Sequence, residues 1–401
     1  MGQIYFIATL WLGLAILSAI IAYHFGISVS LVEICVGMVT VAVAGIFGRA
    51  DSLGTDLEWL KFLGAAGAVF LTFLAGAELD PVVMKTKIKE VAAIGLIGFT
   101  APFIGCSLIA YYVVGWTFQA SLLSGVALST TSVAVVYSVL LGRGLNKTEF
   151  GKGVLGACFF NDIITVLALS FLFSPFTYKS FVFIVVTVGA LTTLPLITKW
   201  LTRVYAYRSA AIRTKWIIFV LFGLGALAVW SGSEAVLPAY LVGMILAGSA
   251  AKDADWIRRF RTLTVGFLTP FYFLRAGMLV SLASLAAAPF VFLALLAGKV
   301  ASKIFGLYPA IRIFRKHPKE RWYYTLMMST GLTFGTISAL FGLSHNIISQ
   351  SQYSFIVAAV ISSAVVPTLI AEIWFLPKHL LPSDGAVENQ QPEENEIQDE
   401  G

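Results

Sequence analysis

The chain has 401 residues, of which 58% are hydrophobic and only 12% are charged. Soluble domains average about 45–50% apolar and about 25% charged residues, so this composition excludes a soluble globular protein and indicates a polytopic membrane protein. The formal charge of +6 is expected to reflect the orientation of loops in a lipid bilayer, and we expect no nucleic-acid partner. All three cysteines lie in apolar runs, which indicates neither a disulfide framework nor a metal-ligand spacing.

Thirteen apolar segments follow one another along the chain, each near the roughly 20 residues that a helix needs to cross a bilayer. No basic residue precedes the first segment, so we expect a first span and not a cleaved signal peptide. The pattern predicts an all-α membrane domain over residues 1–376. Its expected spans are residues 4–23, 29–48, 58–80, 91–115, 118–141, 150–173, 180–201, 214–231, 235–250, 262–284, 288–311, 322–343 and 352–375.

Basic residues cluster on one side of this arrangement. Lys and Arg gather after the third, fifth, seventh, ninth and eleventh spans, whereas the opposite side has only Arg49, Lys61 and Lys179. Basic loops stay in the cytoplasm, so we expect a cell (inner) membrane protein with its N-terminus outside and its C-terminus inside.

The last segment differs in character from the spans. Residues 384–401 carry seven acids and no basic residue, so we predict a disordered acidic cytoplasmic tail over residues 377–401. No phosphate-binding loop and no second globular domain follow the spans, so nothing indicates nucleotide binding or any other cofactor.

Thirteen spans divide into six, one and six. Spans one to six and eight to thirteen are offset by seven, so corresponding helices run in opposite directions, with span seven as a linker. This is the pattern of an inverted-topology repeat. Hydroxyl and glycine residues at mid-span can satisfy backbone groups that a broken helix releases, although they also serve close helix packing. Such residues predict two broken helices: Ser129, Thr130, Thr131 and Ser132 in span five, and Ser329, Thr330, Gly331 and Gly335 in span twelve.

Span six contains a carboxylate at mid-depth. A charged Asp162 is costly there, so we interpret it as a functional site and hold a purely structural ion pair as the alternative. Cys158, Asn161, Asp162 and Thr165 share one helix face at i, i+3, i+4 and i+7. Carboxylate, amide and hydroxyl oxygens are hard ligands, which suit a small alkali cation. Carbonyls and hydroxyls released at residues 130–132 would complete a monovalent cation site.

Four further ionisable residues lie within the spans. We assign Lys299, Arg275 and Glu78 as supporting charges, although the role of Arg275 is open. Because Asp162 is the only carboxylate of comparable depth, Lys299 or Arg275 is expected to face the same polar interior. Lys303 follows Lys299 by one turn and is expected either to share that face or to reach out to the interface.

Five runs in order along the chain resemble the monovalent cation:proton antiporter superfamily. They are FLAGAELDP in span three, STTSVAVV in span five, the ND pair in span six, AGK in span eleven and SSAVVPTLIAE in span thirteen. The resemblance covers residues 4–376 and implies a thirteen-helix fold. It also implies a dimerisation domain, a core domain with two crossing broken helices, a homodimer and elevator-like movement.

The same resemblance implies roles for particular residues. Asp162 is expected to bind the cation and the proton, with Asn161 beside it and with Thr131 and Ser132 lining the site. Lys299 matches the basic residue of the core. Relatives differ at three places: some have aspartate at the position of Asn161 or Ser132, and others have serine near the position of Cys158.

These residues predict an antiporter that exchanges Na⁺, or Li⁺, for H⁺ by competition at one carboxylate. Since Asn161 cannot titrate, exchange is expected to be electroneutral. Potassium-efflux members often continue into a nucleotide-binding domain that does not follow here, which favours sodium over a K⁺/H⁺ antiporter as the alternative. A sodium-coupled symporter or a channel is less favoured. An enzyme is not expected, because an intramembrane aspartyl protease needs two aspartates at mid-depth.

Overall fold

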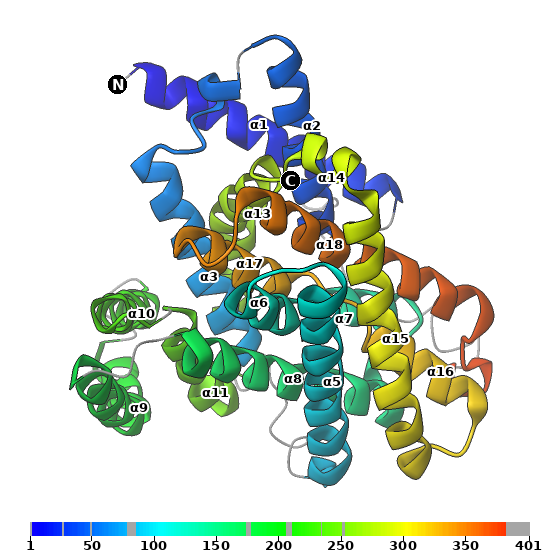
Figure 1. The fold of residues 1–401 in the computed structure, drawn as a ribbon. Coiled ribbons are helices and arrows are strands. Elements are labelled where there is room, and N and C mark those ends of the chain that lie inside the picture. Colours follow the sequence, from blue (N-terminus) through cyan, green and yellow to red (C-terminus); the bar gives the residue numbers. More distant parts are fainter. Residues whose placement is uncertain are drawn as a thin grey trace, which may run out of the picture.

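The computed structural model describes residues 2–25, 28–48, 50–77, 86–173, 178–205, 211–233, 235–250 and 253–381. Within these ranges the chain is helical and contains no strand (Figure 1). Nine described helices are long and apolar enough to cross a membrane. They are α1 (Gly2–Phe25), α2 (Val29–Ile46), α3 (Glu58–Ala77), α5 (Ile88–Leu108, continued by the π turn Ile109–Val113), α8 (Glu149–Phe173), α9 (Tyr178–Tyr205), α10 (Ile212–Ser231), α15 (Pro289–Phe314) and α18 (Gln350–Trp374).

Four more predicted spans are built from shorter pieces. Two are the broken helices, α6 (Phe118–Ser129) with α7 (Val133–Gly142), and α16 (Pro318–Met327) with α17 (Thr333–Ser344). The others are α11 (Val236–Ala250), and α12 (Ala254–Leu263) joined through the π turn Thr264–Leu268 to α13 (Thr269–Met278). The short elements are η1 (Ala50–Leu53), η3 (Leu145–Lys147), α14 (Leu282–Ala287) and η5 (Lys378–Leu380).

Both predicted breaks are present, and hydroxyl groups satisfy the backbone around them. At the first break Thr130 is extended, and the side chain of Ser132 accepts a hydrogen bond from the Val135 amide at 3.3 Å. At the second break Thr330 donates to the carbonyl of Met327 at 2.8 Å. The Ser, Thr and Gly runs therefore mark real interruptions, as predicted from their chemistry.

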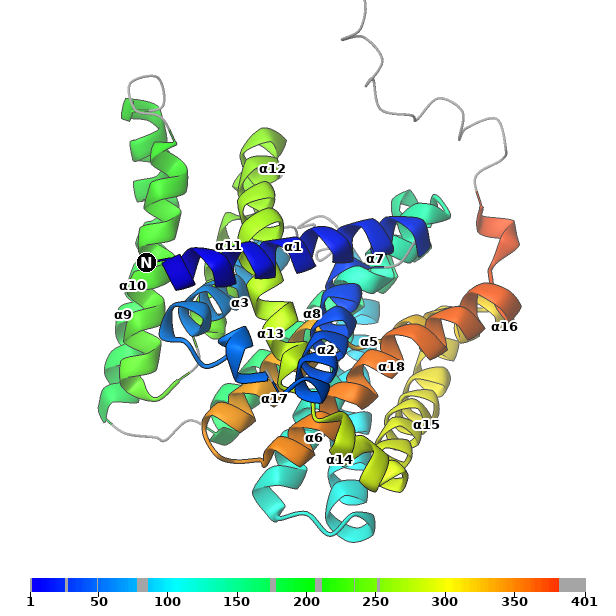
Figure 2. The ribbon, with the colours of Figure 1, turned by 90° about the horizontal axis from the view of Figure 1, so that it is seen from above.

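The helices form two groups. The core group contains α5 to α8 and α15 to α18, centred on the pairing of α5 with α15. The scaffold group contains α1 to α3 and α9 to α13, centred on the pairs α2 with α13 and α3 with α11. Figure 2 shows α9 and α10 standing at one edge of the molecule and α15 lying at the other.

Glycines allow the two scaffold pairs to approach closely. A Cβ added at Gly37 or Gly277 would overlap a carbonyl oxygen of the facing helix where α2 meets α13. The same holds for Gly76 and Gly243 where α3 meets α11. Small residues are the usual means of tight helix contact in membranes. In the inverted repeat, span two corresponds to span nine and span three corresponds to span ten. The pair of α2 with α13 therefore corresponds to the pair of α11 with α3, as an inverted repeat requires.

The ordered chain extends beyond the predicted end of the membrane domain. Residues 375–381 are described, and Phe375 stacks on Trp322 with ring centroids 5.3 Å apart. Leu380 and Leu381 pack against the apolar cluster of α5, α8, α15 and α16. The remaining tail, residues 382–401, lies outside the described residues, so its predicted disorder stays a prediction.

Candidate functional site

The two helix breaks are hydrogen-bonded to each other. Thr131 Oγ1 donates to the carbonyl of Met328 at 2.9 Å, and the Ser132 amide donates to Thr330 Oγ1 at 3.4 Å. These contacts join segments nearly 200 residues apart in sequence. We refer to residues 130–132 and 328–332 together as the crossing. All of its hydroxyl-bearing residues are buried.

Two lysines of α15 end at the crossing. Lys299 Nζ donates to the carbonyl of Thr130 at 3.3 Å, and Lys303 Nζ donates to Thr131 Oγ1 at 3.0 Å. Both side chains are fully buried, so Lys303 does not reach out to the interface, and that option was wrong. Its i+4 spacing from Lys299 places both ammonium groups on one helix face.

Gly331 provides the space that Lys299 occupies. A Cβ at Gly331 would overlap Lys299 Nζ. Because α6 ends at Ser129, the ammonium of Lys299 lies at the negative end of this half-helix dipole. This position lets a buried cation interact favourably with the backbone without a carboxylate partner.

Asp162 and Asn161 lie on α8 and are almost fully buried, with 2% and 0% of their surfaces exposed. The Oδ1 atoms of both residues accept no hydrogen bond from the part of the chain that the structure describes. Asn161 directs its amide nitrogen to the carbonyl of Gly95 on α5 at 3.4 Å. Two hard oxygen atoms on consecutive residues are therefore buried without a donor among the described residues, which is costly unless a proton or a cation satisfies them.

No described residue lies close enough to Asp162 to form an ion pair with it. A structural ion pair, the alternative weighed for Asp162, is therefore not the arrangement observed. Lys303 instead hydrogen-bonds Thr131, which in turn bonds the carbonyl of Met328.

Cys158 connects α8 to the second break. Its thiol donates to the Met328 thioether at 3.5 Å, and both residues are fully buried. A Cβ at Gly98 of α5 would lie 3.3 Å from Met328 Cε and 3.6 Å from Asn161 Nδ2. The predicted face of α8 therefore does meet the crossing, and Gly98 of α5 lies near both Met328 and Asn161.

The hydroxyls predicted to surround a cation already have protein partners. Thr130 Oγ1 donates to the carbonyl of Ala127, and the Ser132 hydroxyl is used at the start of α7. Ser329 Oγ donates back into α16, to the carbonyl of Thr325 at 2.8 Å. Gly335 brings α17 against α6, since a Cβ there would lie 3.0 Å from Thr130 Oγ1.

Arg275 does not face the crossing. It lies on α13 in the scaffold group, half-buried, and its Nε donates to the carbonyl of Thr55 at 3.0 Å. It therefore holds the segment between η1 and α3, and its assignment as a supporting charge of the site was wrong. Glu78 lies outside the described residues, so its assignment stays a prediction.

Two tyrosines that the sequence analysis missed join the scaffold group to the core group. Tyr240 Oη on α11 donates to the carbonyl of Phe159 on α8 at 3.1 Å, and Tyr272 Oη on α13 donates to Thr336 Oγ1 on α17 at 3.2 Å. Each tyrosine follows a proline by two residues, a shared Pro-x-Tyr pattern that could have pointed to them.

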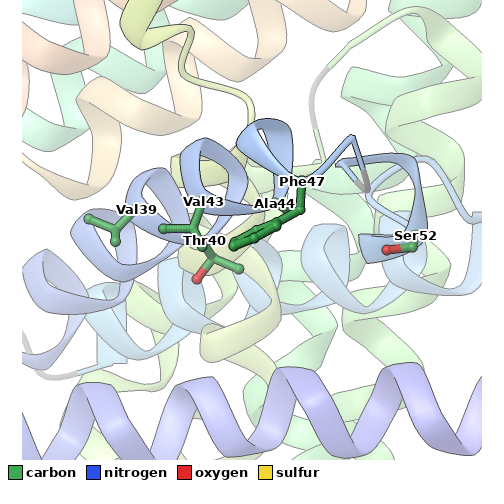
Figure 3. A pocket seen from close by; sticks show the side chains of 6 residues that line it. All are labelled: Val39, Thr40, Val43, Ala44, Phe47 and Ser52. Atoms are coloured by element: carbon green, nitrogen blue, oxygen red, sulfur yellow. The ribbon is translucent and has the colours of Figure 1, made fainter.

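A cavity of ≈ 650 Å³ lies away from this site (Figure 3). Its lining comes from α2 and η1: Val39, Thr40, Val43, Ala44, Phe47 and Ser52. None of these residues belongs to the crossing or to the Asp162 face of α8. We therefore assign the functional site from the polar groups at the crossing and not from cavity size.

Two interrupted helices whose breaks are bonded to each other, beside a buried carboxylate, define a secondary ion transporter of the broken-helix class. The chain belongs to the family described as "Sodium/hydrogen exchanger, transmembrane", which matches residues 12–376. It is a multi-pass membrane protein and a cation/proton antiporter, as the sequence predicted.

Relatives of known name include both sodium and potassium proteins. The chain is 26% identical over 336 residues to the "Probable Na(+)/H(+) antiporter 3" of Methanocaldococcus jannaschii, covering 79% of this chain and 84% of that protein. It is 25% identical over 383 residues to the glutathione-regulated potassium-efflux system protein KefC of Shigella flexneri, covering 90% of this chain and 59% of that protein. For KefC of Salmonella arizonae the identity is 27% over 355 residues, with 82% and 54% covered. The chain thus spans little more than half the length of these KefC proteins.

The fold is similar to the structure of the sodium proton antiporter MjNhaP1 from Methanocaldococcus jannaschii. The TM-score is 0.65 at 16% identity, and the match covers 93% of this chain and 96% of that chain. This likeness confirms the predicted all-α membrane fold with two broken helices.

Proposed function

We propose that the protein exchanges Na⁺ for H⁺ at Asp162, with the same carboxylate taking either ion in turn. The observation that carries this proposal is the pair of buried oxygens, one on Asp162 and one on Asn161, that no donor among the described residues satisfies. A proton would satisfy the carboxylate oxygen alone. A small cation would satisfy both oxygens at once, and both are hard ligands suited to it.

Lys303 is proposed to balance the carboxylate when neither ion is bound. Its hydrogen bond to Thr131 holds it at the crossing, which Cys158 joins to the face of α8 that carries Asp162. Lys299 is held separately by the carbonyl of Thr130. We propose that both lysines keep their protons through the cycle, because Lys299 faces the Thr130 carbonyl at the negative end of the α6 dipole and Lys303 bonds the Thr131 hydroxyl. One proton then replaces one cation, so exchange is electroneutral.

The movement that carries the ion is proposed to be a displacement of the core group against the scaffold group. The side-chain hydrogen bonds of Tyr240 and Tyr272 join the two groups next to the site. Trapping these contacts with a disulfide between α11 and α8 should stop exchange, and reduction should restore it. Continued exchange with the disulfide intact would contradict an elevator-like movement.

We further propose that basic loops face the cytoplasm of a cell membrane and that the protein forms a homodimer, as the family resemblance implies. In intact cells, an impermeant maleimide should label a cysteine at position 61 and not one at position 316, after the three native cysteines are replaced by serine. Light scattering in detergent should give a dimer mass. Labelling only at position 316, or a monomer mass, would contradict these assignments.

Proteoliposomes loaded with a pH dye test the exchange directly. An inward gradient of Na⁺ or Li⁺ should make the lumen alkaline without any organic solute, and choline should not. Cation entry without proton movement would indicate a channel, and a requirement for a solute would indicate a symporter. A K⁺ response larger than the Na⁺ response would favour the potassium alternative that the KefC relatives raise.

A further inference from the structure

We propose that His317, Glu320 and His379 form a binding site for a divalent transition-metal ion, with Zn²⁺ as the best match. The ligand atoms of these three side chains all lie within 4.8 Å of one another. The cluster is separate from the crossing, because it lies where α16 begins and where the chain continues past α18.

The three residues come from two well-defined elements. His317 is the N-cap residue of α16, and Glu320 follows three positions later in its first turn. His379 belongs to η5, and its Nε2 lies 2.7 Å from Glu320 Oε1. The rings of His317 and His379 lie with centroids 4.6 Å apart. All three side chains therefore converge on one point.

The residues around the proposed metal site are well packed, and this packing holds His379 in place. Phe375 stacks on Trp322 of α16, and Trp322 in turn contacts Tyr308 of α15. Leu380 and Leu381 pack against the apolar cluster that includes Tyr323 of the same helix. These contacts fix residues 375–381 against α16 and bring the His379 side chain to Glu320.

Two imidazoles and one carboxylate are a ligand set that zinc uses with a fourth position left for water. Ideal zinc bonds of about 2.0–2.2 Å place tetrahedral donor atoms about 3.3–3.5 Å apart. The present separations, from 2.7 Å to less than 4.8 Å, span that value, so rotations of the exposed imidazoles suffice. Alkali cations prefer oxygen ligands, so the exchanged cation is a poor match for this site.

A simpler structural role explains only part of the cluster. A first-turn carboxylate such as Glu320 is favoured by the helix dipole, but this does not account for two imidazoles that converge on it. Lys316, Lys319 and Lys378 lie next to the ligands along the chain and oppose a cation. They are exposed to solvent, which screens them, whereas Glu320 is buried with 8% of its surface exposed.

Metal at this site would tie residues 378–380 to the start of the second broken helix. The second broken helix belongs to the core group, and Leu380 and Leu381 pack against the apolar cluster of that group, so the metal would join parts that move together. We therefore expect bound zinc to raise thermal stability and to leave the exchange rate within about twofold, whereas zinc at Asp162 would compete with the transported cation.

The test uses the full chain in detergent with any histidine tag removed. Calorimetry with ZnCl₂ should give one site per chain, and the melting temperature should rise with zinc concentration. Glu320→Gln and the double change at His317 and His379 to alanine should weaken binding about tenfold or more. His24→Ala and His345→Ala are the matched controls and should bind as the unchanged protein does.

Cobalt keeps the proposal testable if a variant does not fold. Co²⁺ bound to the unchanged protein should give the visible absorption of a four-coordinate nitrogen and oxygen site, and one equivalent of Zn²⁺ should remove it. Absence of a saturable site, binding that survives the double change, or equal loss in the two control variants would overturn the assignment.

Discussion

The two halves of the chain bring opposite charges to one site. The first half supplies Asp162 on α8, and the second supplies Lys299 and Lys303 on α15. In the inverted repeat α15 corresponds to α5, whose surface toward the site carries Gly95 and Gly98 and no base. The backbone framework is thus duplicated while the chemistry is not. The repeat provides two equivalent breaks. Different residues on the corresponding helices then give each break a different role.

The two breaks also differ in the groups that they present to the site. The first presents the Thr130 carbonyl and the Thr131 hydroxyl, and each of these accepts a hydrogen bond from one lysine. The second presents the Met328 carbonyl to Thr131 and leaves room for Lys299 at Gly331. The first break therefore holds the charges, and the second shapes the space around them.

Removing the acid should have the largest effect. Asp162→Asn should reduce exchange to the background of empty liposomes, because no other carboxylate faces the crossing among the described residues. The protein should still fold, since a neutral amide is cheaper to bury than a carboxylate. Glu58→Gln is the matched control, because Glu58 is an exposed acid paired with Lys61. Retained exchange in purified Asp162→Asn would remove it from the mechanism.

Replacing the two buried lysines should have different effects. Lys303→Gln should lower the exchange rate at neutral pH about tenfold, a change of about 1.4 kcal/mol, because the crossing loses the positive charge that we propose balances Asp162. Lys299→Gln should lower the melting temperature and change the exchange rate less than Lys303→Gln does, since the partner of Lys299 is a backbone carbonyl. Lys316→Gln, at an exposed position, should change neither. Equal rate losses for the two buried lysines would contradict the separate roles.

Competition at one carboxylate predicts a simple pH dependence. As pH falls below the value at which Asp162 takes up its proton, the apparent KM for the cation should rise about tenfold per pH unit. The maximal rate at saturating cation should change less. Initial rates at several fixed pH values measure both quantities. An apparent KM that stays constant while the maximal rate collapses would indicate a separate proton sensor.

The scaffold symmetry makes a prediction about stability. Gly277→Ala and Gly243→Ala should each cost about 1–3 kcal/mol, because the added methyl meets a backbone carbonyl of the facing helix. Gly45→Ala and Gly223→Ala are the controls, since nothing lies within 4 Å of a Cβ at either position. Thermal unfolding in detergent measures the losses. A large loss in only one helix pair would show that the two pairs are not equivalent.

The smallest expected effect is that of the membrane potential, which should drive no proton flux. If one proton replaces one cation, a potassium-valinomycin potential across proteoliposomes without other gradients should drive no proton flux. A flux that follows the sign of the potential would mean that a lysine also releases its proton during the cycle. Repeating the measurement with Lys299→Gln and Lys303→Gln would identify which lysine carries it.

Composition and periodicity were enough to predict the thirteen spans, the inverted repeat and the two breaks. Each depends on a local property: the length of an apolar run, the sidedness of charge, or hydroxyls that replace helical hydrogen bonds. The isolation of Asp162 in an apolar segment was equally visible, because an acid at that depth has few purely structural explanations.

Only the tertiary structure decided which charges face one another. The helical period places Lys299 and Lys303 on one face of α15, but it does not say how that face is rotated toward α6 and α8. Arg275 is as deep in its span as Lys299, yet α13 turns it to the Thr55 carbonyl in the scaffold group. Met328 carries no polar side chain, and its backbone became important only because a break 197 residues away in sequence meets it. Partners so distant along the chain are set by helix packing, which local sequence does not encode.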